Sequence, residues 1–140
     1  MTAGFTPPAH WTEIATQLRK SAQVTLDGSG KGSVTFSTDH ANQRWVVTTV
    51  TVGTNQDAAA TLVPYCTGAL NTTDITQMSP GNQFGTTWDG NNDTFTGPFD
   101  LDPVSFYSVL WYPPPGQDGS SLAGVIASAV VTGTKYTRRA

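Results

Sequence analysis

Residues 23–52 read QVTLDGSGKGSVTFSTDHANQRWVVTTVTV, and this segment indicates the fold class. Apolar and polar residues alternate on both sides of a glycine-rich turn, Gly28–Gly32. Because successive side chains of a strand point to opposite faces, the alternation predicts an antiparallel hairpin. Arg44–Val52 follows and is almost purely β-branched, which favours a third strand and a meander. The pattern puts Trp45, Val47, Thr49 and Thr51 on one face of this strand and Val46, Thr48, Val50 and Val52 on the other.

The remaining chain supplies enough further strands for a two-sheet sandwich. Turn signals and apolar runs predict strands at 59–66, 74–78, 94–101, 104–112 and 122–136. The run at 104–112 is apolar on both faces, which is typical of a central strand. We therefore expect an all-β, two-sheet antiparallel sandwich of jelly-roll type with about eight strands. Its domain spans residues 22–140, and residues 1–21 form an N-terminal arm with one short helix.

The N-terminal segment is the part expected to meet a partner. Apolar residues recur at helical spacing over Trp11–Lys20, with an acid in the first turn and two bases in the last, which predicts a helix. Such a short helix must pack, either on its own sandwich or on another protein. The preceding residues are either a frayed terminus or a docking arm. The candidate partner-binding residues are Phe5, Pro7, Pro8, Trp11, Ile14 and Leu18.

Composition narrows the class of protein. Only 12% of the 140 residues are charged and the net charge is −3, which argues against a general nucleic-acid binder. No stretch is long and apolar enough to predict a membrane span, and the first residues do not resemble an export signal. The single cysteine, Cys66, excludes an internal disulfide framework and is expected to be a small buried residue. A β-rich chain without an export signal suits a virion protein assembled in the host cytoplasm.

Catalytic chemistry is not predicted, because the chain has one Glu, two His and one Cys. No cofactor is expected. The best ion-binding candidate takes its oxygen ligands from positions 1, 3, 5 and 12 of a calcium-hand spacing. A Thr where the invariant Gly should be, and an Asp in place of the last Glu, make a simple Asp-Gly-Asn turn the better account. The four candidate ligands are Asp89, Asn91, Asp93 and Asp100.

Aromatic residues outside the helix suggest a second kind of site. An aromatic face beside polar side chains could stack on a pyranose ring, which would make the domain a carbohydrate-binding module. For Trp88, as for Phe84, the alternative is that the side chain plugs the open end of the sandwich or lies at an interface. The candidates for ligand binding are Trp88, Trp111 and Tyr112.

At LDGSGKGSVTF and QRWVVTTVTV the sequence resembles small β-sandwich virion proteins, head-decoration or minor tail components, of tailed actinobacteriophages. The resemblance covers roughly Ala22–Tyr65 and a closing strand that ends VVTGTKY. It implies a non-enzymatic capsid decoration or cement protein that binds the major capsid protein or other virion proteins. It further implies a homo-oligomer such as a trimer, with a minor tail or head–tail junction protein as the alternative. The matching residues are Leu26, Gly28, Gly30, Gly32, Phe36, Arg44, Trp45 and the Val positions of the two motifs.

Overall fold

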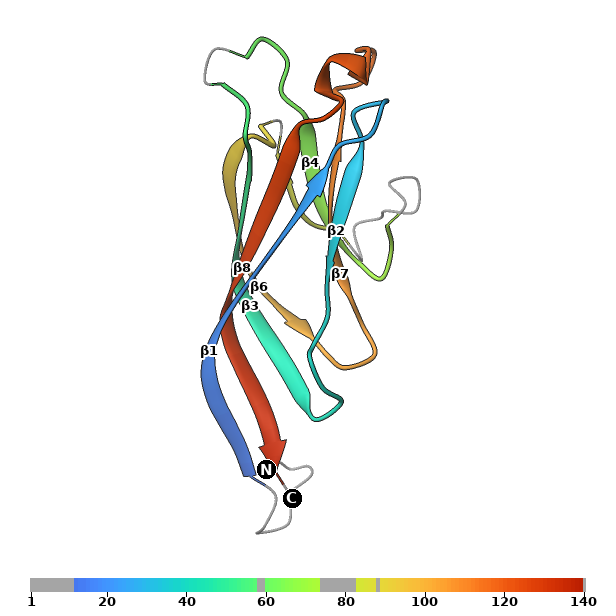
Figure 1. Cartoon of the computed structure of the whole chain (residues 1–140). Coiled ribbons are helices and arrows are strands. Elements are labelled where there is room, and N and C mark those ends of the chain that lie inside the picture. The colour runs from blue at the N-terminus through green and yellow to red at the C-terminus, as the bar shows by residue number, and fades with distance from the viewer. Residues whose placement is uncertain (1–11, 58–59, 74–82, 88, 140) are drawn as a thin grey trace.

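The described part of the chain consists of eight β-strands and one short 3-10 helix (Figure 1). The computed structural model describes residues 12–57, 60–73, 83–87 and 89–139, and every structural statement below refers to these. In chain order the elements are β1 (Thr12–Thr25), β2 (Gly32–Phe36), β3 (Gln43–Thr54), β4 (Tyr65–Leu70), β5 (Gln83–Thr87), β6 (Asn92–Leu101), β7 (Tyr107–Tyr112), η2 (Gly119–Leu122) and β8 (Ile126–Arg139).

The strands form two four-stranded antiparallel sheets, which confirms the predicted jelly-roll sandwich. The long sheet has the order β1-β8-β3-β6, and the short sheet has the order β2-β7-β4-β5. Every connection between successive strands crosses to the other sheet except the one from β4 to β5. Alternating sheets in this way lets apolar residues from the whole chain meet between the two layers.

The core fills the space between the sheets and is dominated by β3 and β7. Trp45, Val47, Val50 and Val52 of β3 are all buried, although the plain alternation predicts that Trp45 and Val50 face opposite ways. A register shift between Val47 and Thr49 is the reason, because one extra residue in a strand reverses the facing of all that follow. The predicted faces of this strand are therefore wrong beyond the shift.

The helix predicted over Trp11–Lys20 is wrong where it can be compared, because residues 12–25 form β1. This strand pairs with β8 in one continuous antiparallel register, from Thr12 opposite Arg139 to Thr25 opposite Ile126. Apolar residues four positions apart share a face in a helix and also in a strand, so the pattern that suggested a helix fits both. The predicted domain boundary after residue 21 falls inside β1.

The glycine-rich turn does not close a hairpin. β1 pairs with β8 in the long sheet, whereas β2 pairs with β7 in the short sheet, so Gly28–Gly32 carries the chain from one layer to the other. The turn is narrow, since the Asp27 N–H donates to the carbonyl of Lys31 at 2.9 Å. Gly30 has a φ of +80°, and a Cβ there would lie 2.5 Å from the carbonyl oxygen of Gly119. The predicted meander is therefore wrong, although its first and third strands both lie in the long sheet.

The later strands agree with the predictions only in part. The fourth strand begins at Tyr65, directly after Pro64, and not at residue 59. β5 was not predicted, and the strand predicted at 74–78 lies outside the described residues. β7 begins at Tyr107 and not at residue 104, and Val104, included in the predicted strand, is 90% exposed. β7 is buried on both faces between β2 and β4, as predicted for a central strand.

The two sheets differ in length, and the long sheet projects past the short one. β1 and β8 have 14 residues each, whereas the strands of the short sheet have five or six. At the projecting end, Thr12–Gln17 of β1 pairs with Thr134–Arg139 of β8; we call this pair the terminal ribbon. Figure 1 shows the ribbon at the lower end of the molecule. Among the described residues, no helix is long and apolar enough to cross a membrane.

Candidate functional site

The terminal ribbon exposes β1 on both faces. Residues 13–17 are all exposed, whereas Leu18, the next residue, is 1% exposed and belongs to the core. Ile14 is 39% exposed, which makes it one of the few large apolar side chains on the described surface. A two-stranded ribbon is at best marginally stable alone, so its order depends on neighbouring β3 and on side-chain contacts. The ribbon therefore offers backbone and side chains that its own core does not use.

A network of charged and aromatic side chains fastens the ribbon to β3. Arg44 donates from Nε and Nη2 to the two carboxylate oxygens of Glu13, at 3.0 and 3.2 Å. Its guanidinium also lies 4.2 Å from the ring centroid of Tyr136, within the range of a cation–π contact. The hydrogen bonds to Glu13 raise the pKa of Arg44 above its ordinary value, which keeps the guanidinium charged. The edge strand is thus held to β3 across β8.

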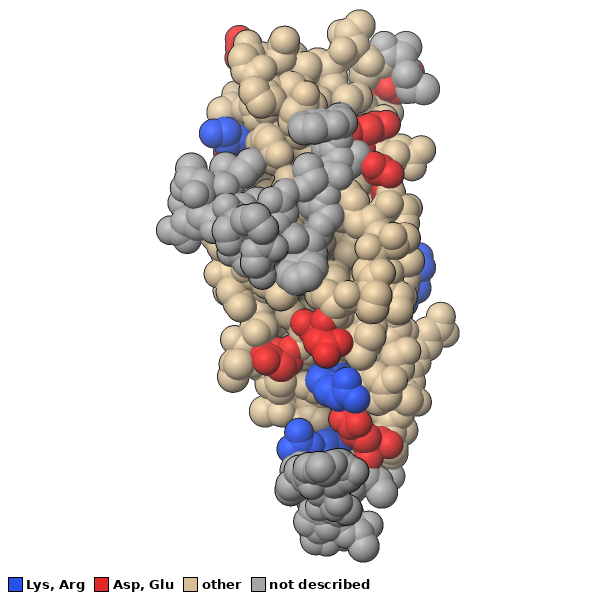
Figure 2. Space-filling view, turned by 180° about the vertical axis from the view of Figure 1, so that it is seen from behind, with Lys and Arg blue, Asp and Glu red and all other residues tan. Residues whose placement is uncertain are grey.

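A second ion-pair group lies where the ribbon meets the two-layer region. The carboxylate of Asp39 is 3.1 Å from the Lys20 ammonium and 3.9 Å from that of Lys135. All three side chains are at least a quarter exposed, so this group orients the 37–42 loop more than it stabilises the fold. Figure 2 shows side chains of both signs close together toward this end of the molecule, with further charged side chains, mostly acidic, toward the other end.

The predicted partner-binding residues separate into three groups. Phe5, Pro7, Pro8 and Trp11 lie outside the described residues. Ile14 is exposed on the terminal ribbon. Leu18 is a correction: it packs in the core of its own chain and has almost no surface to offer a partner.

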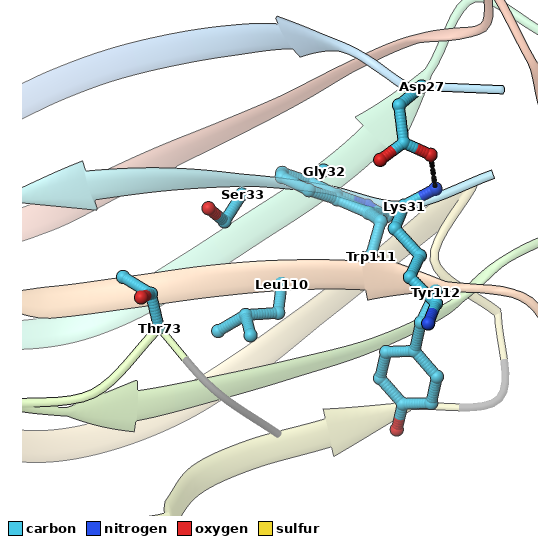
Figure 3. Close-up of a pocket in the computed structure, with 8 residues that line it drawn as sticks. All are labelled: Asp27, Lys31, Gly32, Ser33, Thr73, Leu110, Trp111 and Tyr112. Atoms are coloured by element: carbon cyan, nitrogen blue, oxygen red, sulfur yellow. Dashed lines mark hydrogen bonds between the residues drawn. The ribbon is translucent and has the colours of Figure 1, made fainter. Parts of the chain in front are cut away.

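The other prominent feature is a pocket on the outer face of the short sheet (Figure 3). Its volume is about 340 Å³. Leu110 and Tyr112 project from β7 along one side, and Lys31 and Ser33 flank them from the turn and β2. The Tyr112 hydroxyl is 3.0 Å from Oγ1 of Thr67, which fixes the ring position. The full lining is Asp27, Lys31, Gly32, Ser33, Thr73, Leu110, Trp111 and Tyr112.

The three aromatic ligand candidates do not form one platform. Trp111 is 1% exposed, belongs to the core, and donates from Nε1 to the carbonyl of Gly90 at 3.1 Å, so it cannot stack on a sugar. Tyr112 is half-buried and meets Tyr65 edge to face, with ring centroids 6.0 Å apart. Trp88 lies outside the described residues. Tyr112 is the candidate that the described surface supports.

The calcium-hand arrangement is not formed. Asp89 and Asp93 accept hydrogen bonds from nearby backbone N–H groups, at 3.1 Å from Asn91 and 2.8 Å from Thr94. Asn91 Oδ1 accepts from the Thr54 hydroxyl. Asp93 and Asp100 lie on one extended strand, which puts them roughly 20 Å apart and prevents a shared ion. The simpler reading as a turn beside a strand is the correct one.

Two side chains that can act as nucleophiles, Cys66 and Tyr107, are buried in the core. Burial raises the pKa values of the Cys66 thiol and the Tyr107 hydroxyl, so both stay neutral near pH 7. Cys66 is a free, buried cysteine in a strand, as predicted. Within the described ranges, no three His, Cys, Asp or Glu side chains come close enough to hold a metal ion.

The sequence identified Ile14 of the ribbon as a partner-binding candidate but assigned it to a helix, so it did not reveal the exposed strand that carries this residue. The signal was present as an alternation over Glu13–Leu18, with Ile14, Thr16 and Leu18 on one side and Glu13, Ala15 and Gln17 on the other. Lys31 and Ser33 of the pocket carried no signal of their own, since they flank it only after β2 has joined β7.

Comparison with known proteins adds little to this geometry. No protein-family model matches the chain, and a search of curated proteins found no match. Five chains of solved structures are similar to it. One of them, titled "Turnip yellow mosaic virus", aligns with a TM-score of 0.41 and 10% identity over 99% of this chain and 87% of the other.

Proposed function

We propose that this chain is a non-enzymatic structural protein of a virion, a decoration or cement protein that binds the assembled capsid. The observation that carries the proposal is the terminal ribbon: residues 13–17 are held in place by Arg44 and β8 but are exposed on both faces. The core does not need these residues. The resemblance of LDGSGKGSVTF and QRWVVTTVTV to phage virion proteins supports the same class of function.

In this proposal the sandwich is a rigid body and the N-terminal segment makes the contact. Residues 1–11 precede the ribbon in the sequence, and in this proposal both contact the capsid. Each apolar Å² that they bury on capsid subunits contributes roughly 25 cal/mol. Because the segment binds neighbouring subunits only in the assembled shell, it stabilises the shell by mass action. The partners are the major capsid protein or other virion proteins, with no role for nucleic acid or a membrane.

The test compares occupancy on particles for matched variants. Removal of residues 1–11 leaves every described strand intact, whereas a cut after residue 20 would take Leu18 out of the core. We expect this truncation and Ile14→Glu to give folded protein that no longer decorates particles. Ile126→Glu makes the same change at an isoleucine of nearly equal exposure, opposite Thr25 at the other end of β1, and should bind normally. Full occupancy of both ribbon-side variants would refute the proposal.

Copy number separates the capsid from the tail. A decoration protein should be present in proportion to the major capsid protein, whereas a minor tail or head–tail junction protein is present in a few copies per particle. Quantitative mass spectrometry of purified particles gives this ratio directly. If only a few copies are present and binding to the particle still requires the ribbon, the protein is a structural component of the tail or the head–tail junction.

A carbohydrate-binding module is the second candidate, and the pocket around Tyr112 favours it. The pocket combines a half-buried aromatic ring with Lys31 and Ser33, a mixture of apolar and polar groups that suits a sugar. A glycan array would show binding that Tyr112→Ala abolishes and that Ile14→Glu leaves unchanged. Loss on Trp88→Ala would support the same class through a different side chain.

A further inference from the structure

The four edge strands of the two sheets differ in how well they are protected against pairing with a further strand. β2 and β5, at the edges of the short sheet, have five residues each. β6 edges the long sheet, and it carries Pro98, a register shift against β3 and the acidic residues Asp93 and Asp100. Short length, proline, irregular register and charge are the devices by which proteins block unwanted strand pairing. Three of the four described edges therefore use them.

β1 lacks most of these devices. It has 14 residues, contains neither proline nor glycine, and keeps an unbroken register with β8. Among the described strands it pairs with β8 alone. One row of its backbone N–H and C=O groups therefore points away from the sheet, along an edge without a bulge whose side chains are exposed over residues 13–17. Such an edge accepts a further strand with little rearrangement.

We propose that this edge pairs antiparallel with β1 of a second copy, about a two-fold axis at Thr16. Two identical antiparallel strands are related by an axis perpendicular to the sheet, so residues opposite one another lie on the same face. An axis at Thr16 therefore places Glu13 opposite Arg19 of the second copy, and the pair occurs twice. Ile14 then lies opposite Leu18. Opposite charges facing each other across strands favour the register.

Neighbouring registers lack this charge match. Glu13 is the only acid of β1, so few registers can pair it with a base. An axis at Gln17 puts Glu13 opposite Ser21, and an axis at Arg19 puts two arginines face to face, which destabilises the pair. The carboxylate of Glu13 already accepts two hydrogen bonds from Arg44 and retains lone pairs for a second guanidinium. A second copy of the chain is therefore the partner that fits this edge, because β1 itself carries both the acid and the base that pair across the two-fold axis.

The paired span, Thr12–Lys20, lies mostly on the terminal ribbon, where the short sheet does not reach. Joining two long sheets this way gives one continuous eight-stranded sheet with the order β6-β3-β8-β1-β1-β8-β3-β6. The faces of the ribbon stay open, so a capsid contact through Ile14 and the N-terminal segment remains available to the pair. The second copy is thus one partner of the ribbon. The dimer itself does not depend on the proposed function, and only its place in a virion rests on that proposal.

A cysteine at the two-fold axis tests the register. In Thr16→Cys the two new thiols would face each other, with Cα atoms about 4.5 to 5.5 Å apart, a separation that a disulfide spans. The native Cys66 is buried and should not compete. We expect mild oxidation to convert Thr16→Cys to a covalent dimer. Gln23→Cys is the control: in this register the two residues 23 lie roughly 46 Å apart and should not cross-link.

A charge reversal tests the energetics on the free protein. Arg19→Glu turns both attractive pairs into Glu–Glu contacts and should weaken the dimer at least about tenfold. Lys31→Glu makes the same change in charge at the pocket and should leave the dimer intact. Sedimentation equilibrium at low ionic strength measures both. A wild-type monomer at all concentrations, an uncross-linked Thr16→Cys or an unaffected Arg19→Glu would each overturn the inference. Particle binding is measured separately, so a dimer that does not decorate particles would refute the proposed function alone.

Discussion

The two halves of β1 carry the same backbone pairing and opposite side-chain environments. From Leu18 onward the strand lies over the short sheet. Leu18 is packed in the core, and Ala22 and Val24 pack against that core. Before Leu18 the strand is not covered by the short sheet, and residues 13–17 are exposed. Both halves keep one register with β8. The difference teaches that hydrophobic burial orders the upper half, whereas the lower half depends on strand pairing and on the Arg44 contacts.

The largest expected effect contrasts two aliphatic residues of this one strand. Leu18→Ala should lower the free energy of unfolding by about 2–5 kcal/mol, because it leaves a cavity in a closely packed core. Ile14→Ala should cost less than about 1 kcal/mol, since its side chain is 39% exposed. Urea unfolding of both variants measures the difference. Similar losses for the two would show that the ribbon is as tightly packed as the core.

The two buried tryptophans differ in the hydrogen bonding of their indole N–H groups. Trp111 Nε1 donates to the Gly90 carbonyl at 3.1 Å, whereas Trp45 Nε1, near the ribbon, is buried without a hydrogen-bond partner among the described residues. Trp111→Phe should therefore destabilise the fold by about 1 kcal/mol more than Trp45→Phe, because it also removes a donor from a buried acceptor. Equilibrium denaturation gives both values. A larger loss for Trp45→Phe would mean that its indole N–H has a partner.

The next effect concerns the contact that holds the ribbon. Arg44→Gln removes the bidentate pair with Glu13 and the stacking on Tyr136, an exposed network that should contribute about 0.5–1 kcal/mol. The consequence should be local: amide hydrogen exchange should accelerate in residues 12–17 and stay unchanged in residues 18–25. Uniform acceleration along β1 would contradict the division of the strand into two halves.

The smallest effect is a pH dependence at the opposite end of the sandwich. Hydrogen bonds from the Ser29 hydroxyl and from the Lys31 and Ser29 N–H groups lower the pKa of Asp27 below 3.8. Because the folded pKa is lowered, this contribution to stability is present above the unfolded pKa and is lost as the pH falls through the folded value. Asp27→Asn should therefore show a shallower decline in melting temperature below about pH 4 than the wild type. Parallel declines would exclude this contribution.

The sequence predicted the fold class because the β-branched runs of β3 and β8 and the aromatic and apolar run of β7 favour strands. It did not predict which strands pair. Alternation at Val24–Leu26 and Val34–Phe36 identifies two strands, but nothing local shows that the Gly28–Gly32 turn separates them into different sheets. β1 was missed because the spacing between Ile14 and Leu18 fits a helix and a strand equally. The pocket could not be predicted, since its lining residues come from three segments that only the sheet order brings together.

Hydrogen exchange of this protein, free and bound to particles, tests the central claim most directly. The claim is that the terminal ribbon is the surface the fold leaves for a protein partner. The account predicts that amides of residues 12–17 exchange more slowly on the particle than in free protein of known oligomeric state, while those of β2 and β7 around Tyr112 are unchanged. Slower exchange at β2 and β7 with an unaltered ribbon would contradict it.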